Sequence, residues 1–215
     1  MPEDEQETSG ISRKHFIVAA GVGALAVPAA LSAAGPASAR VRPEAGQRLL
    51  TPTPKCTDGD STATPSQMEG PYFKPNSPER ADLTTPGMPG TKLTVSGIVY
   101  SQSCKPINRA LLDFWQADNY GNYDNSGFTL RGHQYTDAQG RFTLTTIVPG
   151  LYPGRTRHIH VKLQAPGRSI LTTQTYFPNE PRNQTDSLYD PRLLMKVTNG
   201  PNGRDAVIDF VLRVP

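Results

Sequence analysis

The sequence predicts an all-β protein, an antiparallel β-sandwich with long loops, and three observations support that fold class. Its 215 residues include 19 glycines and 21 prolines, which weaken or break helix interiors. Short segments rich in β-branched and aromatic residues recur between turn residues. No long segment has a strong helical period of apolar residues. This composition excludes long coiled coils and polytopic membrane proteins, and a net charge of only +3 argues against a disordered chain.

Residues 1–39 are predicted to be a removable export signal. The basic pair Arg13-Lys14 precedes an uncharged apolar run over 16–35, and Ala37–Ala39 supplies a small-x-small cleavage site. Pro28 within the run argues against a membrane-spanning helix. The pair resembles a bacterial twin-arginine signal, but a lysine replaces the second arginine, so the general secretory route is the alternative. We therefore expect an exported protein, extracellular or on the cell surface, with no membrane partner once the signal is removed.

Residues 40–66 are rich in Pro, Thr, Ser and Arg and lack periodicity, which predicts a linker or surface arm before a single domain over 67–215. After removal of the signal, 20 basic and 15 acidic residues remain, a net charge of +5. No run of Lys and Arg is long enough to indicate a nucleic-acid or membrane surface. We therefore expect no nucleic-acid partner.

Six strands are expected along the domain. Lys92–Ser101 alternates Leu93, Val95 and Val99 with polar residues, which is typical of a strand with one buried face. Asp190–Lys196 is the one segment expected to form a helical turn. The other strands share β-branched and aromatic content and end at Gly, Pro, Asn or Asp: Ala110–Ala117, Gly140–Val148, His158–Gln164, Ile170–Phe177 and Ala206–Val214.

The two cysteines, Cys56 and Cys104, are expected to form a disulfide. An even count in an exported chain favours a bridge, and the spacing fits no metal-binding pattern, although two unpaired thiols are the alternative. The bridge would clamp the arm against the sandwich. Its loss should lower thermal stability, because the arm has little apolar content of its own.

A group of metal-ligand side chains is expected around His158-Ile159-His160. Residues i and i+2 of a strand face the same side, so the two imidazoles project together and Ile159 faces the core. Two surface histidines would be the ordinary interpretation of this pattern alone. Tyr152 lies six residues upstream between two Pro-Gly pairs, and Tyr123 ends an aromatic, Asp- and Asn-rich loop. Phenolates are hard ligands that suit ferric iron.

With these motifs in place, the sequence resembles the intradiol ring-cleavage dioxygenases, of the catechol and protocatechuate type. The resemblance covers roughly residues 52–178. Four blocks carry it and occur in the family's order: Glu69–Phe73, Asp113–Tyr123, Thr136–Tyr152 and Arg155–His160.

The resemblance implies one non-haem Fe(III) per chain, held by Tyr123, Tyr152, His158 and His160 in long loops and on one strand. It further implies that O₂ cleaves a small aromatic diol to a cis,cis-muconate-type product. Three more roles follow from matching positions. Tyr152 would leave the metal and accept a catechol proton, and the Arg155 charge would stabilise electron density on the ring. Gln174 would lie near the same place, and Tyr72 would form a pocket wall. Loss of the Cys56–Cys104 bridge should then expose the Tyr72 side of the pocket and raise the apparent KM.

Other residues and other functions offer alternatives to these assignments. Tyr120 and Arg157 are alternatives for the ligand and the charge, but each departs from the motif spacing. Trp115 is expected to be core packing. A secreted β-sandwich binding or adhesion module is the alternative function, and a copper or zinc hydrolase is disfavoured by the phenolates. The sequence predicts neither the ring substituents of the catechol nor the oligomeric state.

Overall fold

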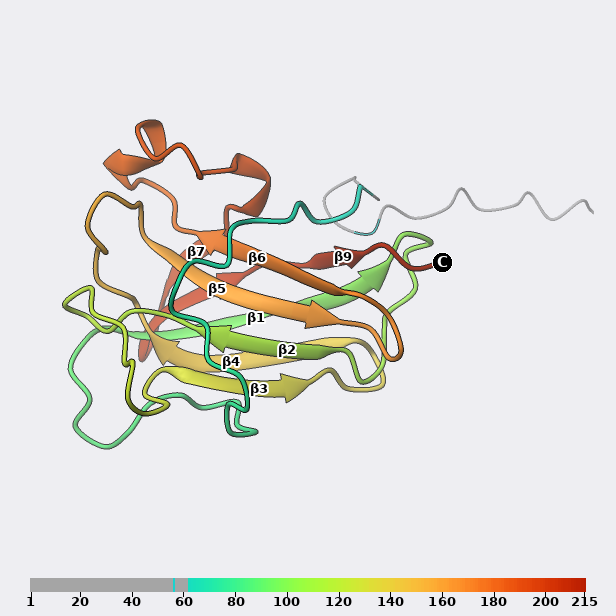
Figure 1. Ribbon diagram of the computed structural model, residues 1–215, viewed down its shortest axis with the longest axis horizontal. Coiled ribbons are helices and arrows are strands. Elements are labelled where there is room, and N and C mark those ends of the chain that lie inside the picture. Colours follow the sequence, from blue (N-terminus) through green and yellow to red (C-terminus); the bar gives the residue numbers. More distant parts are fainter. Residues whose placement is uncertain (1–55, 57–61) are drawn as a thin grey trace, which may run out of the picture. The chain divides into compact units, whose positions relative to one another are not determined.

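The computed structural model describes Cys56 and residues 62–215 (Figure 1). The expected export signal and most of the expected linker lie outside the described residues. Within the described part of the chain, no helix has the length and apolar character needed to span a bilayer.

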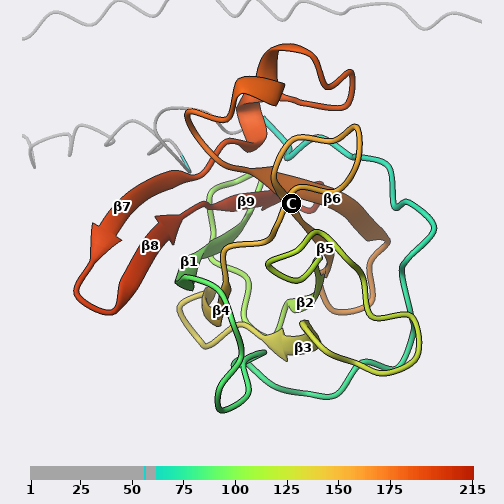
Figure 2. The same cartoon turned by 90° about the vertical axis from the view of Figure 1, so that its left-hand side faces the viewer.

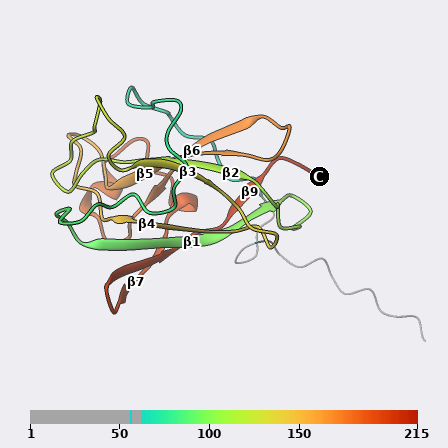
Figure 3. The same ribbon diagram turned by 90° about the horizontal axis from the view of Figure 1, so that it is seen from below.

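In the described part of the chain, nine strands form two sheets, which Figure 3 shows as two layers. The first sheet has the order β4-β1-β8-β7, with β9 also paired to β1, and the second has the order β3-β2-β5-β6. The first sheet contains β1 (Lys92–Ser101), β4 (Arg141–Ile147), β7 (Lys196–Gly200), β8 (Gly203–Val207) and β9 (Phe210–Leu212). The second contains β2 (Leu111–Trp115), β3 (Arg131–Tyr135), β5 (His158–Gln164) and β6 (Ile170–Tyr176).

The core lies between the two sheets because one face of each strand is apolar. In β1, Leu93, Val95 and Val99 are buried, and in β5, Ile159 and Val161 are buried against them in the same cluster. These are the alternations that the sequence predicts. The polar residues of β5 therefore point to the outer face of the second sheet, away from the first.

The sandwich is confirmed, with two differences in the first sheet. β1 pairs with both β8 and β9 in parallel, so this sheet is mixed rather than purely antiparallel. The strand expected over Ala206–Val214 is divided, because the Asp209 carboxylate accepts from the Ile98 amide where β8 ends. Gly97 makes room for this break: a Cβ at that position would lie 1.8 Å from the Ile208 carbonyl oxygen.

Strands β3 and β7 were not predicted. β3 reads RGHQY, which has no apolar alternation. Gly132 takes a core-facing position in this strand, and polar segments of the chain cover the opposite face. β7 belongs to an exposed hairpin with β8 that extends to one side of the molecule (Figure 2). The expected helical turn is a short 3₁₀ helix, η2 (Pro191–Leu193), and a second, η1 (Pro181–Gln184), precedes it.

Residues 62–82 form a strap across the outer face of the second sheet, the teal segment of Figure 1. Near one edge, the Gln67 amide donates to the Thr172 carbonyl of β6 at 2.8 Å. At the other, the Arg80 amide donates to the His133 carbonyl of β3 at 2.8 Å. The strap therefore spans all four strands and carries Tyr72 over them. Further back along the chain, Cys56 is bridged to Cys104 in the β1–β2 turn.

Candidate metal centre

The site is built on one rung of the second sheet. Strand register places Arg131, Trp115, His160 and Gln174 side by side across β3, β2, β5 and β6. Trp115 was expected in the core, but its ring lies on the outer face and stacks on His160 with 4.7 Å between centroids. The rung therefore forms a rigid floor under the strap.

The two histidines of β5 project to the same side, as the two-residue period predicts. Their ring centroids lie 4.8 Å apart, and both side chains are buried. Ile159 between them packs into the core. The His158 Nδ1 lies 2.6 Å from the Thr156 carbonyl oxygen. Because a carbonyl can only accept, Nδ1 carries the proton and Nε2 offers its lone pair.

Tyr123 joins the two histidines. Its hydroxyl oxygen lies 3.1 Å from Nε2 of His158 and 3.1 Å from Nε2 of His160. Three possible ligand atoms, from a loop and a strand 35 residues apart, therefore meet at one point.

The Tyr123 loop is docked on the Tyr152 loop through backbone. The Gly150 amide donates to the Asp118 carbonyl at 2.6 Å. Gly121 has a φ of +90°, and a Cβ there would lie 2.4 Å from the Leu151 carbonyl oxygen. Only glycine fits both the left-handed backbone and the close approach. This contact sets the two tyrosines at a ring separation of 5.8 Å.

Tyr152 contacts the strap. Its hydroxyl lies 2.9 Å from the hydroxyl of Tyr72, and the Tyr72 ring stacks on Tyr123 at 4.6 Å. The hydrogen bond with Tyr152, together with burial, raises the pKa of Tyr72. Either hydroxyl of this pair can donate to the other. Among the described residues, the Tyr152 hydroxyl is hydrogen-bonded to Tyr72 and not to a histidine.

Arg155 is held beside these groups by two acceptors. Its Nε donates to Asp186 at 2.8 Å and its Nη2 donates to the Gln174 Oε1 at 2.7 Å. Gln174 is fixed in turn, because its Nε2 donates to the Met68 carbonyl at 2.8 Å. Arg157 turns elsewhere, to Glu180 at 2.6 Å. Arg155 is therefore the arginine that the structure brings to the site.

Burial controls the charge of the site. Desolvation lowers the pKa of His158 to about 4 and that of His160 well below its usual value, so both rings are neutral. Burial also raises the pKa of Tyr123, although Arg155 and Arg131 partly oppose this. A phenol with a raised pKa ionises at neutral pH only when a cation compensates the charge.

These groups fit a metal ion. Donors that each lie about 2 Å from one ion at right angles stand about 3 Å apart, which is close to the Tyr123–imidazole distances found here. Among the described residues, no cluster of three or more His, Cys, Asp or Glu side chains could hold a metal. A metal at this site therefore requires tyrosine ligands, which favours a hard ferric ion.

Comparison of the sequence with known protein families agrees with this geometry. A family model described as Dioxygenase matches residues 68–213. The chain belongs to the intradiol dioxygenase family.

Solved and curated relatives of this intradiol dioxygenase chain extend the match. The dioxygenase domain of a dioxygenase carbohydrate-binding protein fusion from Streptomyces sp. SirexAA-E is 64% identical, with a TM-score of 0.71 over 72% of this chain and 100% of that one. The 3-chlorocatechol 1,2-dioxygenase of Rhodococcus opacus 1CP is 30% identical, with a TM-score of 0.64 over 70% and 73%. Catechol 1,2-dioxygenase 2 of Acinetobacter lwoffii is 32% identical over 57% of this chain and 54% of its own length. The chain spans about half the length of the curated relatives it matches.

Two buried residues of this dioxygenase chain were missed from the sequence. Arg131 donates from Nη1 to the Tyr72 carbonyl at 2.5 Å and from Nε to the Asp124 carbonyl at 3.0 Å, so it ties the strap to the Tyr123 loop. Asp186 holds Arg155. The register of β2 with β3 could have indicated Arg131, had β3 been recognised. No local pattern marks Asp186, which lies in an irregular segment after η1.

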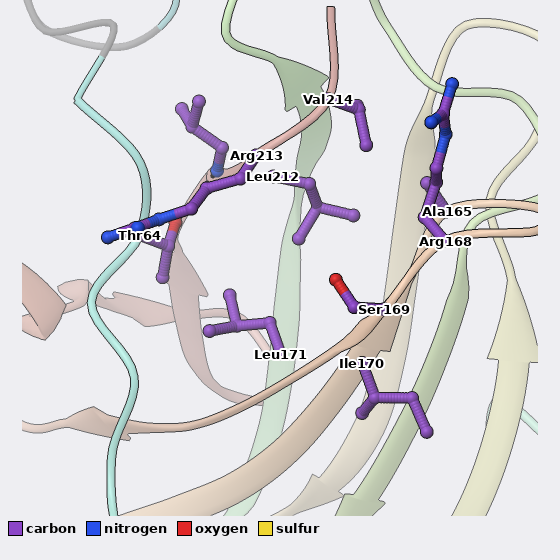
Figure 4. Close-up of a pocket in the computed structure, with 10 residues that line it drawn as sticks. Thr64, Ala165, Arg168, Ser169, Ile170, Leu171, Leu212, Arg213 and Val214 are labelled. Carbon is purple, nitrogen blue, oxygen red and sulfur yellow. Dashed lines mark hydrogen bonds between the residues drawn. The ribbon is translucent and has the colours of Figure 1, made fainter. Parts of the chain in front are cut away.

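Two cavities differ in their relation to the site. One of about 220 Å³ is lined by Tyr123 and by the loops on either side of it. Another, of about 100 Å³, lies at the far end of β5 and is lined by Thr64, Leu171 and Leu212 among others (Figure 4). None of the expected site residues lines the second cavity, so the two tyrosines and two histidines remain the chemical centre of the described chain.

Proposed function

We propose that this protein cleaves a catechol-type aromatic diol with O₂ at a non-haem Fe(III) centre, between the two hydroxylated carbons, to give a cis,cis-muconate-type product. The observation that carries the proposal is the Tyr123 hydroxyl 3.1 Å from both buried imidazole nitrogens. Tyr152 stands next to it on a loop docked to the Tyr123 loop. Family membership supplies the reaction class.

Tyr123, Tyr152, His158 and His160 would hold one iron per chain. When bound, ferric iron would supply a hard Lewis-acid centre that takes the two oxygens of a catechol and withdraws electron density from its ring. The Thr156 carbonyl fixes the His158 tautomer, so its Nε2 remains free to ligate. The Trp115 ring holds His160 in orientation by stacking.

Tyr152 would accept a proton from a catechol hydroxyl. Its loop is joined to the body through backbone contacts, while its side chain meets Tyr72 at the hydroxyl and packs edge-on against the rings of Tyr72 and Tyr123. When the Tyr152 oxygen is negatively charged, the Tyr72 hydroxyl can only donate to it and would stabilise that charge. The pair therefore gives this chain a proton acceptor with a fixed partner.

Arg155 would stabilise negative charge that develops on the aromatic ring. Its guanidinium is half-buried, and in a partly desolvated site a fixed cation acts more strongly than in water. Gln174 holds one side of it and Asp186 the other.

We also propose that the enzyme is exported and acts on diols outside the cell. The signal expected over residues 1–39 supports this, and so does the Cys56–Cys104 bridge, because disulfides persist in oxidising compartments. A secreted binding module would have no use for two tyrosines and two neutral histidines around one point, so that alternative is not favoured.

Oxygen uptake over a panel of substituted catechols, with product identification by mass spectrometry, tests the proposed reaction. We expect one O₂ to be consumed per diol and a muconate-type diacid that contains both atoms of that O₂. A ring-opened semialdehyde, or no O₂ uptake by iron-loaded protein on any diol, would contradict it.

A further inference from the structure

The segment from Glu180 to Asp190, between β6 and β7, supports the loop that carries the site arginine. Asp186 lies just beyond η1, and its side chain is only 2% exposed. Its Oδ2 accepts from the Arg155 Nε and from the Thr156 amide, both at 2.8 Å. Its Oδ1 accepts from the Leu188 amide at 2.9 Å. A buried carboxylate with donors on both oxygens is held in a single orientation.

We propose that Asp186 is the positioning residue for Arg155, a role that rests on the proposed function. By holding Nε, it fixes the plane of the guanidinium so that Nη2 meets Gln174. With Nε and Nη2 both engaged, the guanidinium cannot turn freely, and its positive charge stays beside Gln174, which is paired with His160 across β5 and β6.

The neighbouring arginine shows that the two carboxylates of this segment direct their partners differently. Glu180 binds the Nε of Arg157, whose Nη1 donates to the Pro149 carbonyl, away from the two histidines. Arg155 and Arg157 are two residues apart and have the same chemistry. Their different orientations follow from which carboxylate each one meets.

Gln174 cannot hold Arg155 in place by itself. Its Oε1 is shared between Arg155 at 2.7 Å and the Tyr176 hydroxyl at 3.2 Å. It is a neutral acceptor at one end of the guanidinium, so the side chain could rotate about that contact. A charged acceptor on Nε removes this freedom.

Asp186→Asn is the informative variant because it keeps an oxygen for the Arg155 and Thr156 donors and removes the charge. We expect iron content and resting visible absorption to match wild type, while kcat/KM falls about 10- to 100-fold, the scale of a small misplacement of a catalytic group. Asp190→Asn is the matched control. Asp190 lies in the same segment and pairs with the exposed Arg192, so kcat/KM should be unchanged. Wild-type kcat/KM in a folded Asp186→Asn protein would overturn the proposal.

A double-mutant cycle separates positioning from a general structural role. If Asp186 acts through Arg155, Asp186→Asn should cause no further loss of kcat/KM in an Arg155→Ala background. A second, additive loss would overturn the proposal. If Asp186→Asn alone does not fold, positioning predicts that Arg155→Ala/Asp186→Asn folds, because no arginine is then left unpaired. Failure of both to fold would show a structural role instead.

The same cycle distinguishes this proposal from the proposed function. The coupling between Arg155 and Asp186 can also be measured by thermal unfolding of the four proteins, without any substrate. Wild-type protein inactive on every diol would reject the reaction. Non-additive thermal shifts at Arg155 and Asp186 would still report the coupling, and additive shifts would reject the coupling alone.

Discussion

At the scale of single residues, the candidate site depends on the hydroxyl groups of two tyrosines, and each hydroxyl contacts different side chains. Tyr123 meets both histidines, and Tyr152 meets Tyr72. These two phenols therefore have different tasks. In the proposed mechanism Tyr123, which is surrounded by buried groups, would serve as a fixed ligand, and Tyr152, which meets Tyr72, would be the ligand that exchanges.

Replacing Tyr152 tests that difference. Tyr152→Phe should keep part of the iron but change the colour, and kcat/KM for catechol should fall at least about 100-fold because the proton acceptor is lost. Tyr120→Phe is the control, since Tyr120 is 73% exposed in the neighbouring loop and should behave as wild type. Stopped-flow mixing of catechol with each variant measures the binding step. Full activity in Tyr152→Phe would remove Tyr152 from the mechanism.

The depressed pKa of His158 predicts a pH dependence of stability for iron-free protein. The imidazole binds its proton near pH 6.5 when unfolded and near pH 4 when folded. The unfolded chain therefore holds more protons between these values, and stability is lost as pH falls through this window, by about 3 kcal/mol in all. Urea unfolding from pH 7 to pH 4.5 measures it. His158→Gln should flatten this part of the profile, and identical profiles for the two proteins would contradict the assignment.

At the scale of elements, β5 was predicted with its bounds and orientation because its alternation is regular. The same alternation placed His158 and His160 together. β3 was not recognised, because its outer face meets the strap rather than water and its inner face holds a glycine. The Arg155–Asp186 contact could not be predicted from the sequence for a related reason. It joins two irregular segments 31 residues apart, and no periodicity marks such a contact.

The docking of the two tyrosine loops is testable at Gly121. Gly121→Ala should lose iron and lower the melting temperature, because the new Cβ would clash with the Leu151 carbonyl. Gly154→Ala is a matched control, since Gly154 also has a positive φ, +76°, but open space around it. It should cost only about 1 kcal/mol of stability and keep its iron. Equal iron content in the two variants would show that the docking does not hold the site.

At the scale of the whole molecule, the disulfide and the candidate metal centre lie at opposite ends of the second sheet. Cys104 lies in the turn that leads into β2, whereas Trp115 at the other end of β2 meets His160. Between Cys56 and Tyr72 the strap is held independently, by Thr64 on Val211 and Gln67 on Thr172. This arrangement revises the sequence-based expectation that loss of the bridge exposes the Tyr72 side of the pocket.

Cys56→Ser should therefore lower stability without changing catalysis much. Closing a loop over a separation of 48 residues is worth about 4 kcal/mol in chain entropy. We expect a lower melting temperature and a KM within about twofold of wild type. Thermal unfolding and steady-state O₂ uptake measure the two effects. A large rise in KM would show that the bridge orders the strap as far as Tyr72.

The iron content and visible spectrum of the purified, iron-loaded protein test the central claim most directly, because two phenolates on Fe(III) give a charge-transfer band. We predict one iron per chain, a visible absorption that dithionite bleaches, and loss of both iron and colour in Tyr123→Phe and His160→Ala. A folded protein that stays colourless and iron-free after reconstitution would contradict the metal centre, and with it the proposed reaction.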